Sequence, residues 1–364
     1  MRRRFVSTLT AAAALLCATS AFALDRGFNT SSVDELTQTD YNQMANAGST
    51  TIRLAFSNSP LARYRDGESQ PKYVEANWDL MHESIDMATA AGLSVIIDPH
   101  HAFGGGRYTM RKFDPFFQDI KYANQWAKML ERLGEELQPY SNSQVWGIQP
   151  LNEPPPYSRL LENNKNEVFL NNVYKKFVRA IRKHNTKHRI ILYYDLLDFE
   201  QDYAKQPSHF RPTGDPGADA KIHYDTHIYW PIAYTHQGHA ERTAPNVTNL
   251  PWPDGKPYFT NENLLERIGA IETWRVGQNG VARNDILIGE WGVTQGNRNC
   301  WNGNVWNPSN GGRHWMEVVY NAIDDYHWTI HSWKSTNRNY DQRFPAKRFT
   351  TVKQMLRGTY NNIY

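Results

Sequence analysis

The chain has 364 residues, and its 40 basic against 37 acidic residues give a formal net charge of +3. The whole surplus consists of Arg2, Arg3 and Arg4, so the rest of the chain is electrically neutral. A neutral chain exerts no electrostatic attraction on nucleic acid or on an anionic membrane surface. We therefore expect neither nucleic acid nor a membrane as a partner of the mature protein.

The first 23 residues have the layout of a secretory signal peptide. The three arginines precede an apolar run at 9–17, and the small residues Ala21 and Ala23 flank Phe22. This run is too short to span a bilayer, and the pattern predicts cleavage after Ala23. We expect a secreted or periplasmic protein in which residues 24–364 form one catalytic domain. Only Cys300 remains after cleavage, so no intrachain disulfide can form.

From residue 24 onward, short apolar runs rich in β-formers alternate with segments of helical period. The alternation predicts parallel strands joined by right-handed helical crossovers. The predicted strands are 27–29, 50–56, 93–100, 145–152, 189–195, 221–229, 285–291 and 328–333, and the predicted helices are 78–88, 122–137, 169–181, 264–274 and 314–326. Eight strands are the number that closes a single (β/α)8 barrel. An open doubly wound sheet is the alternative, but no glycine-rich phosphate motif follows the first strand.

Polar side chains close most of the predicted strands. In a (β/α)8 barrel the active site lies at the carboxyl ends of the strands. These ends carry Arg53, His100, Asn152, Glu153, His227, Tyr229, Glu290 and Trp333. One such carboxylate is more often a helix cap or an ion-pair partner, but a whole set on one face is costly to bury without a function. The three prolines that follow Glu153 end the fourth strand there.

Two carboxylates on different strands suit the cleavage of a glycosidic bond, in which one protonates the leaving oxygen and the other attacks carbon. The ordered strand ends resemble those of glycoside hydrolase family 5, the large cellulase-type family of retaining β-glycanases with a (β/α)8 barrel. The resemblance covers nearly the whole mature chain. It rests on Arg53, "DPH" at 98–100, "NEP" at 152–154, "HIY" at 227–229, "GEWG" at 289–292 and Trp333.

The resemblance implies a role for each matching residue. Glu153 would be the general acid and then the general base, and Glu290 the nucleophile, kept ionised by Arg53 and Tyr229. His100, Asn152 and His227 would support these groups and position sugar hydroxyls. The chain has 12 Trp and 20 Tyr, and aromatic rings are flat platforms for sugars. Among them Trp230, Trp291 and Trp333 are predicted to bind substrate, with Trp328 as the alternative to Trp333 on the last strand.

No cofactor and no metal are expected. The pair His100 and His101 is adjacent on one strand, so the two side chains point to opposite faces and cannot easily share an ion. The residues after the sixth strand, 230–258, are too many for an ordinary loop. They predict a lid or cleft wall in which Trp230, Tyr234, Trp252 and Tyr258 line substrate subsites, or else pack beneath the loop.

The implied substrate is a β-linked polysaccharide or oligosaccharide. An endo-β-1,4-glucanase is expected, and a β-mannanase or an exo-acting β-1,3-glucanase of the same family is the alternative. A non-catalytic polysaccharide-binding barrel is the alternative of another class, and the presence of both Glu153 and Glu290 argues against it. Fold class alone does not select among these substrates, and the sequence does not determine the oligomeric state.

Overall fold

A computed structural model describes most of the chain after the expected signal peptide. The described residues are 24–30, 32–103, 119–154, 165–194, 219, 221–235, 252, 260–277, 281–293, 312–331, 333 and 346–360. Residues 1–23, Cys300 and Tyr258 lie outside them, so the predicted signal peptide stays a prediction. Among the described residues, no helix is both long and apolar enough to cross a bilayer.

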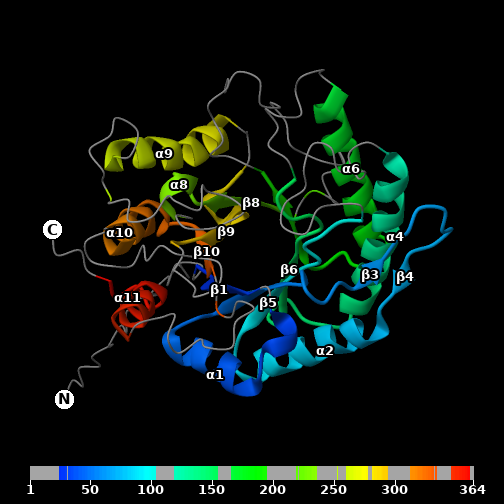
Figure 1. Ribbon diagram of the computed structural model, residues 1–364, viewed down its shortest axis with the longest axis horizontal. Coiled ribbons are helices and arrows are strands. Elements are labelled where there is room, and N and C mark those ends of the chain that lie inside the picture. Colours follow the sequence, from blue (N-terminus) through cyan, green and yellow to red (C-terminus); the bar gives the residue numbers. More distant parts are fainter. Residues whose placement is uncertain are drawn as a thin grey trace, which may run out of the picture.

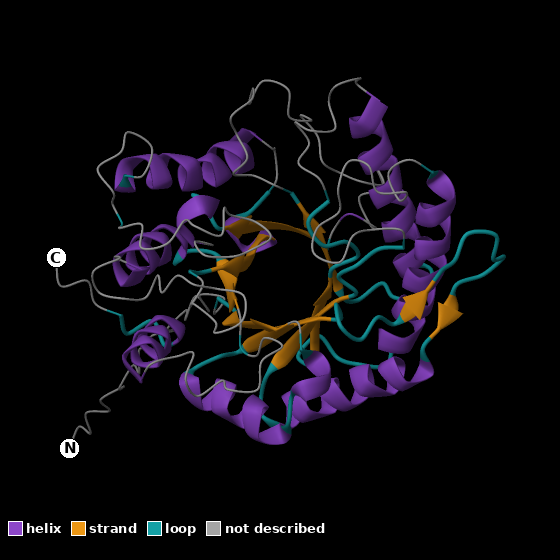
Figure 2. Cartoon of the chain, viewed as in Figure 1, coloured by secondary structure: helices purple, strands orange, loops and turns teal. Residues whose placement is uncertain are grey.

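The eight predicted strands form one closed parallel barrel, surrounded by helices (Figures 1 and 2). The strands pair in the order β1-β10-β9-β8-β7-β6-β5-β2 around the ring. Their bounds are β1 Arg26–Thr30, β2 Thr51–Ala55, β5 Ser94–Asp98, β6 Val145–Ile148, β7 Arg189–Tyr193, β8 Ile222–Ile228, β9 Ile286–Trp291 and β10 His327–His331. The predicted (β/α)8 barrel is confirmed. Strands β5 and β6 end earlier than predicted because Pro99 and Pro150 have no N–H to continue the ladder.

The helices lie outside the barrel and cover its outer surface (Figure 2). Their bounds are α1 Gln38–Ala47, α2 Glu75–Ala90, α4 Ile120–Leu137, α6 Lys165–Arg182, α8 Ile232–Thr235, α9 Asn261–Gly277, α10 Gly312–Ile323 and α11 Ala346–Leu356. Two short 3-10 helices, η1 Val33–Glu35 and η4 Arg283–Asp285, and the antiparallel hairpin of β3 (Ala62–Arg63) and β4 (Lys72–Tyr73) complete the fold. All five predicted helices are present.

Helix α1 was not predicted because its apolar face is narrow, with Tyr41, Met44 and Ala47 as its buried apolar residues. Both ends of the helix are nevertheless marked by capping residues. Asp40 accepts from the backbone N–H of Thr37 at 2.9 Å, and Gly48 ends the helix in the left-handed region with φ 106°. A Thr-x-x-Asp cap followed by a closing glycine marks a helix even where its apolar stripe is short.

The inside of the barrel changes from apolar to polar along its axis. Ile96, Trp146, Ile191 and Leu287, from four different strands, form a separate buried cluster in the interior. Toward the carboxyl ends of the strands, the interior is filled by Arg53, Asp98, Gln149 and Asp225, which are 0% exposed. This apolar layer seals the barrel below the polar groups, as in other packed (β/α)8 interiors.

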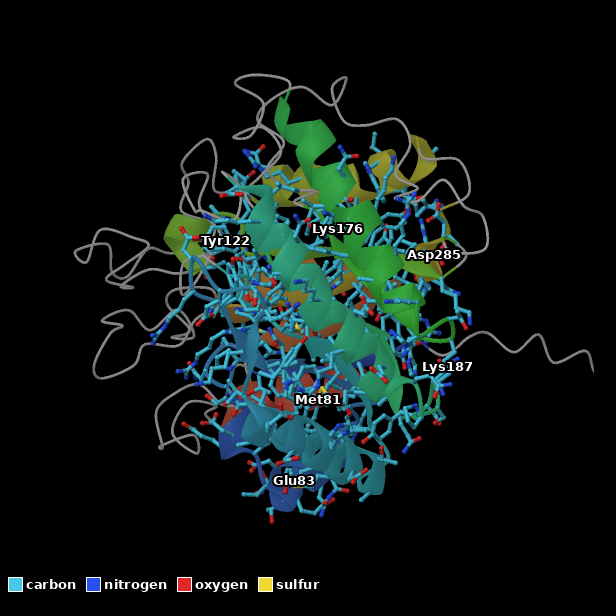
Figure 3. The ribbon with its side chains drawn as sticks, turned by 90° about the vertical axis from the view of Figure 1, so that its right-hand side faces the viewer. Met81, Glu83, Tyr122, Lys176, Lys187 and Asp285 are labelled. Carbon is cyan, nitrogen blue, oxygen red and sulfur yellow. The ribbon has the colours of Figure 1, made fainter. Side chains whose placement is uncertain are left out.

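The two ends of the barrel are separated in the side view of Figure 3. Lys187 and Asp285, which precede β7 and β9, lie toward one end, and Tyr122, near the start of α4, lies toward the other. Helices α4 and α6 run side by side across this face. Their close contact depends on Gly134, where an added Cβ would lie 2.7 Å from the carbonyl oxygen of Ile181.

We expect Gly134→Ala to lower the free energy of unfolding by about 1–3 kcal/mol, because the new methyl group must push α6 away from α4. Gly269 in α9 is the matched control, since a Cβ there meets nothing within 4 Å. Gly269→Ala is expected to leave stability unchanged or raise it by up to ~1 kcal/mol through helix propensity. Urea unfolding followed by circular dichroism measures both. Equal stability of the two variants would contradict this account of the α4 and α6 contact.

Candidate active site

Arg53 of β2 lies at the centre of the polar cluster and is fully buried. Its Nη1 donates to Glu290 Oε1 at 2.7 Å, and its Nε donates to Gln149 Oε1 at 2.6 Å. Its Nη2 donates to Asn152 Oδ1 at 2.7 Å and lies 2.8 Å from Asp98 Oδ2. Burial alone would lower the pKa of Arg53, but the carboxylates of Asp98, Glu290 and Asp225 raise it above its ordinary value. One guanidinium thus joins four strand ends, as the fork geometry of arginine allows.

Two of the predicted residues have strained backbones. His100 has φ 64° and Glu153 has φ 33°, a region that non-glycine residues rarely adopt. His100 is held there by Asp98, which accepts from its backbone N–H at 2.8 Å and lies 2.7 Å from its Nδ1. Such strain persists only where surrounding contacts fix it, and it is concentrated at functional sites. Here it turns the two side chains at the ends of β5 and β6.

Glu290, at the end of β9, is surrounded by donors. Besides Arg53, the Tyr229 hydroxyl donates to its Oε2 at 2.9 Å, and His227 Nδ1 lies 3.7 Å from the same oxygen. Burial alone would raise the pKa of Glu290, but the positive charges of His227 and Arg53 outweigh it and hold the pKa well below its ordinary range. The carboxylate is therefore ionised at neutral pH.

Local strand geometry explains why Glu290 points inward. Strand β9 has one extra residue relative to both neighbours. On the β8 side, the successive residues Thr226 and His227 pair with Ile288 and Glu290. On the β10 side, the pairing shifts in the same way between Trp328 and Ile330. This bulge resets the alternation, as bulges do when they re-aim a side chain. Glu290 then faces the barrel interior, and the next residue, Trp291, faces outward.

His227 links the two glutamates. Its Nδ1 lies 2.7 Å from Glu153 Oε1, and its Nε2 lies 3.3 Å from Asp225 Oδ2. Burial alone would lower the pKa of His227, but the carboxylates of Glu290, Asp225 and Glu153 raise it to about 10. The imidazole is therefore a buried cation at neutral pH, and its Nδ1–H donates to Glu153.

Asp225 was not predicted, although it forms the layer beneath these groups. It is fully buried, and it accepts from Gly289 N at 2.6 Å and from Gln149 Nε2 at 2.7 Å. Gly289 has no side chain here for a steric reason, because a Cβ would lie 2.5 Å from the Asp225 oxygens. The signal in the sequence is the polar alternation of β8. His223, Asp225, His227 and Tyr229 occupy every second position, which is one face of the strand.

The two glutamates lie close together. One carboxylate oxygen of each, together with a ring nitrogen of His227, forms a group whose atoms all lie within 4.8 Å of one another. This trio could also hold a metal ion by distance alone. Arg53 and the protonated His227 place positive charge at the same point, which opposes a cation. The expected absence of a metal stays a prediction.

Two of the tryptophans predicted to bind substrate, Trp291 and Trp333, are buried. Trp291 and Trp328 are 0% exposed and pack edge to face, with ring centroids 5.3 Å apart. Trp333 is 3% exposed, its ring contacts Phe28 at 4.8 Å, and its Nε1 donates to Asp40 of α1 at 3.2 Å. Neither Trp291 nor Trp333 is an open stacking platform, because both fill the space between strands and helices.

The aromatic residues that follow β8 are of two kinds, buried and half-buried. Tyr234 and Trp252 are buried and contact each other at 5.1 Å, so these two residues pack rather than line an open cleft. Trp230 is half-buried, with the Arg267 guanidinium 4.3 Å from its ring centroid. It is the one of the three predicted substrate-binding tryptophans that keeps exposed surface. Tyr258 and most of 236–259 lie outside the described residues.

His331, at the end of β10, is a site residue that sequence reasoning missed. Its Nδ1 lies 3.8 Å from Glu290 Oε2, and its ring meets that of Tyr229 edge to face at 6.2 Å. All seven predicted catalytic and supporting residues come together with it at one end of the barrel: Arg53, His100, Asn152, Glu153, His227, Tyr229 and Glu290.

A closed parallel barrel with two glutamates at the carboxyl ends of its strands defines a barrel enzyme with a paired-carboxylate site. The family described as Cellulase (glycosyl hydrolase family 5) matches residues 19–339. The chain belongs to this family and is a glycoside hydrolase. A probable glucan 1,3-beta-glucosidase A from Aspergillus clavatus is 30% identical over 122 residues, which are 33% of this chain and 28% of that protein. The aligned part is therefore under a third of that relative.

Solved structures share the fold. The cellulose synthase subunit Z of Clostridioides difficile has a TM-score of 0.63 at 18% identity, covering 93% of this chain and 99% of that one. Cel5A of Thermotoga maritima, in complex with mannotriose, has a TM-score of 0.64 at 18% identity, with coverages of 90% and 97%. A GH5-4 broad specificity endoglucanase from Bacteroides salanitronis has a TM-score of 0.65 at 18% identity, with coverages of 93% and 94%.

We expect Asp225→Asn to lower the pKa of His227 below about 10, because the substitution removes one of the negative charges that stabilise the imidazolium. The pKa of His227 is raised on folding, so its charge stabilises the fold fully below pH ~6.5, and this contribution is lost as the pH rises through about 10. Asp225→Asn should therefore flatten the fall in unfolding free energy over that range.

Histidine NMR titration and urea unfolding at several pH values measure the two effects. Asp98→Asn is the matched control, because it removes an equally buried carboxylate that pairs with Arg53 and His100 instead. An unchanged His227 titration in Asp225→Asn, or an equal shift in both variants, would contradict the assignment.

Proposed function

We propose that the protein is a retaining glycoside hydrolase that cleaves β-glycosidic bonds by double displacement. The observation that carries this proposal is the closeness of Glu153 and Glu290, which have carboxylate oxygens within 4.8 Å of each other. Retaining enzymes hold their two carboxyl groups about 5–5.5 Å apart, whereas inverting enzymes need about 6.5–9.5 Å to admit a water molecule. The narrow gap favours direct attack by one carboxylate on carbon.

Glu290 is the nucleophile in this mechanism. Its ionised carboxylate attacks the anomeric carbon, while Glu153 transfers its proton to the glycosidic oxygen and the leaving sugar departs. A covalent ester then joins the sugar to Glu290. Glu153, now a carboxylate, takes a proton from water as the water attacks the same carbon, and the ester bond to Glu290 breaks.

The neighbouring residues stabilise each charge state. Arg53 and Tyr229 hold the two oxygens of Glu290 at 2.7 and 2.9 Å, so the attacking group has little freedom to rotate. His227 donates from Nδ1 to Glu153 Oε1 at 2.7 Å and supports the carboxylate that forms when the proton leaves. In this proposal Asn152 bonds a sugar hydroxyl, and its contact with Arg53 at 2.7 Å supports that role by fixing the amide next to Glu153.

For the substrate we infer a β-1,4-glucan cleaved internally. This inference is supported by family membership and by the endoglucanases among the structural neighbours. A β-1,3-glucan is the second candidate, which the 122-residue likeness to a probable glucan 1,3-beta-glucosidase favours. We further propose that residues 24–364 form one catalytic domain, exported by the signal peptide at 1–23 as a secreted or periplasmic enzyme without a cofactor.

We expect Glu290→Ala to reduce turnover by roughly 10⁴-fold or more, because no other group can form the ester. Glu153→Gln should slow substrates with poor leaving groups far more than activated aryl glycosides, since only the former need a proton donor. Glu83, exposed on α2 and labelled in Figure 3, is the matched control, and Glu83→Gln should retain full activity. Proton NMR of the first product formed reads its anomeric configuration, and initial inversion would contradict a retaining mechanism.

A panel of soluble polymers identifies the substrate. We expect reducing sugar to be released from carboxymethylcellulose or mixed-linkage glucan by the purified mature protein, and not by Glu290→Ala. Glucomannan, galactomannan and laminarin are the comparison polymers. Preference for laminarin would favour the β-1,3-glucanase, and preference for galactomannan the β-mannanase. If the folded protein releases reducing sugar from none of these polymers, a non-catalytic barrel is favoured.

A further inference from the structure

The inward face of β10 carries an unassigned histidine at its carboxyl end. Side chains alternate along the strand, so His327, Thr329 and His331 share one face, and Trp328 and Ile330 share the other. The ring of His327 contacts that of Trp146, a member of the buried interior cluster, with centroids 5.1 Å apart, so this face is the inner one. His331 therefore points into the mouth beside Glu290.

The side chain of His331 is more exposed than the two glutamates and the two buried cations of the site. Its side chain is 37% exposed, against 17% for Glu153 and 9% for Glu290. The side chains of Arg53 and His227 are 0% and 2% exposed. This imidazole is therefore more accessible to a ligand than either glutamate.

The hydrogen-bond partners of His331 determine which nitrogen carries the proton. The Asn29 amide nitrogen lies 3.2 Å from Nδ1, so Asn29 donates and Nδ1 accepts. Loss of water around the ring inside the barrel mouth and the positive charges of Arg53 and His227 lower the pKa of His331, and they outweigh the opposing effect of Glu290. The ring is therefore neutral at neutral pH, and its one proton lies on Nε2.

Within the described residues, Nε2 of His331 has no hydrogen-bond partner, whereas His100 Nδ1 lies 2.7 Å from Asp98 Oδ2 and His227 Nδ1 lies 2.7 Å from Glu153 Oε1. The other nitrogen of this ring, Nδ1, lies 3.8 Å from Glu290 Oε2. A neutral N–H donor this close to the nucleophile can donate a hydrogen bond to a hydroxyl of a sugar bound there. The nearby tryptophans Trp291, Trp328 and Trp333 are buried and cannot perform recognition by stacking at this strand end.

We propose that His331 Nε2–H donates a hydrogen bond to a hydroxyl of the sugar ring whose anomeric carbon Glu290 attacks, and thereby selects the substrate at that position. The inference rests on the proposed double-displacement function, because it places the reacting ring against Glu290. A donor aimed at one hydroxyl discriminates against sugars that lack it more strongly than an apolar surface does.

The test uses 4-nitrophenyl β-cellobioside, β-mannobioside and β-laminaribioside. The one that the wild type hydrolyses fastest is then compared with forms that each lack one free hydroxyl of the ring joined to nitrophenol. These are the 2-, 3- and 6-deoxy forms for a 1,4-linked disaccharide and the 2-, 4- and 6-deoxy forms for the 1,3-linked one. We expect wild type to lose roughly 10- to 100-fold in kcat/KM on one deoxy form. His331→Phe should lose a similar factor on the parent compound and nothing further on that deoxy form. His331→Gln, which keeps an N–H donor, should recover most of the loss.

Controls separate this inference from the function on which it rests. His184→Phe, at a remote side chain with a similar exposure of 33%, should leave kcat/KM unchanged. If the wild type hydrolyses none of these compounds and no polymer, the proposed function fails. If it is active but His331→Phe matches it, or loses equally on all parent and deoxy forms, the role of His331 is overturned. If His331→Phe does not fold, His331→Ala takes its place in the same series, and equal losses on the parent and all deoxy forms would again overturn the role of His331.

Discussion

The site depends on one buried cation, the guanidinium of Arg53. Its ion pairs with Glu290 and Asp98 join β2 to β9 and β5, and its bonds to Gln149 and Asn152 add the residues that follow β6. Breaking a buried ion pair on one side costs about 3–5 kcal/mol, because the remaining charge is left without water or partner. The same contacts that fix the Glu290 carboxylate therefore also hold the strand ends in register.

A second buried cation, the imidazolium of His227, lies against Glu153. His227, held by Asp225 from below, faces Glu153 as Arg53 faces Glu290. Gln149 bridges the two halves, since it accepts from Arg53 and donates to Asp225. The apolar layer of Ile96, Trp146, Ile191 and Leu287 lies beneath them and excludes water from below, which strengthens every charge interaction above it.

Among the described residues, most of the aromatic side chains singled out from the sequence have a structural role. Trp291, Trp328 and Trp333 pack against strands and helices, and Tyr234 packs with Trp252. Large rings fill the space between a strongly curved barrel and its helices, where their buried area contributes to the core. Around Glu290, the described mouth is lined instead by the hydrogen-bonding groups of Arg53, Tyr229, His227 and His331.

The sequence by itself determined the eight strands, the barrel and the seven polar residues at its mouth, because strand ends and prolines are local features that periodicity reveals. It did not determine which aromatic side chains are buried. The bulge in β9 turns Glu290 inward and Trp291 outward, and it exists only relative to the neighbouring strands. Asp225 and His331 were likewise assigned only by the tertiary structure. Their roles come from residues far away in the chain, Gly289 and Gln149 for one and Asn29 and Glu290 for the other, which only barrel closure brings within hydrogen-bonding or ion-pair distance.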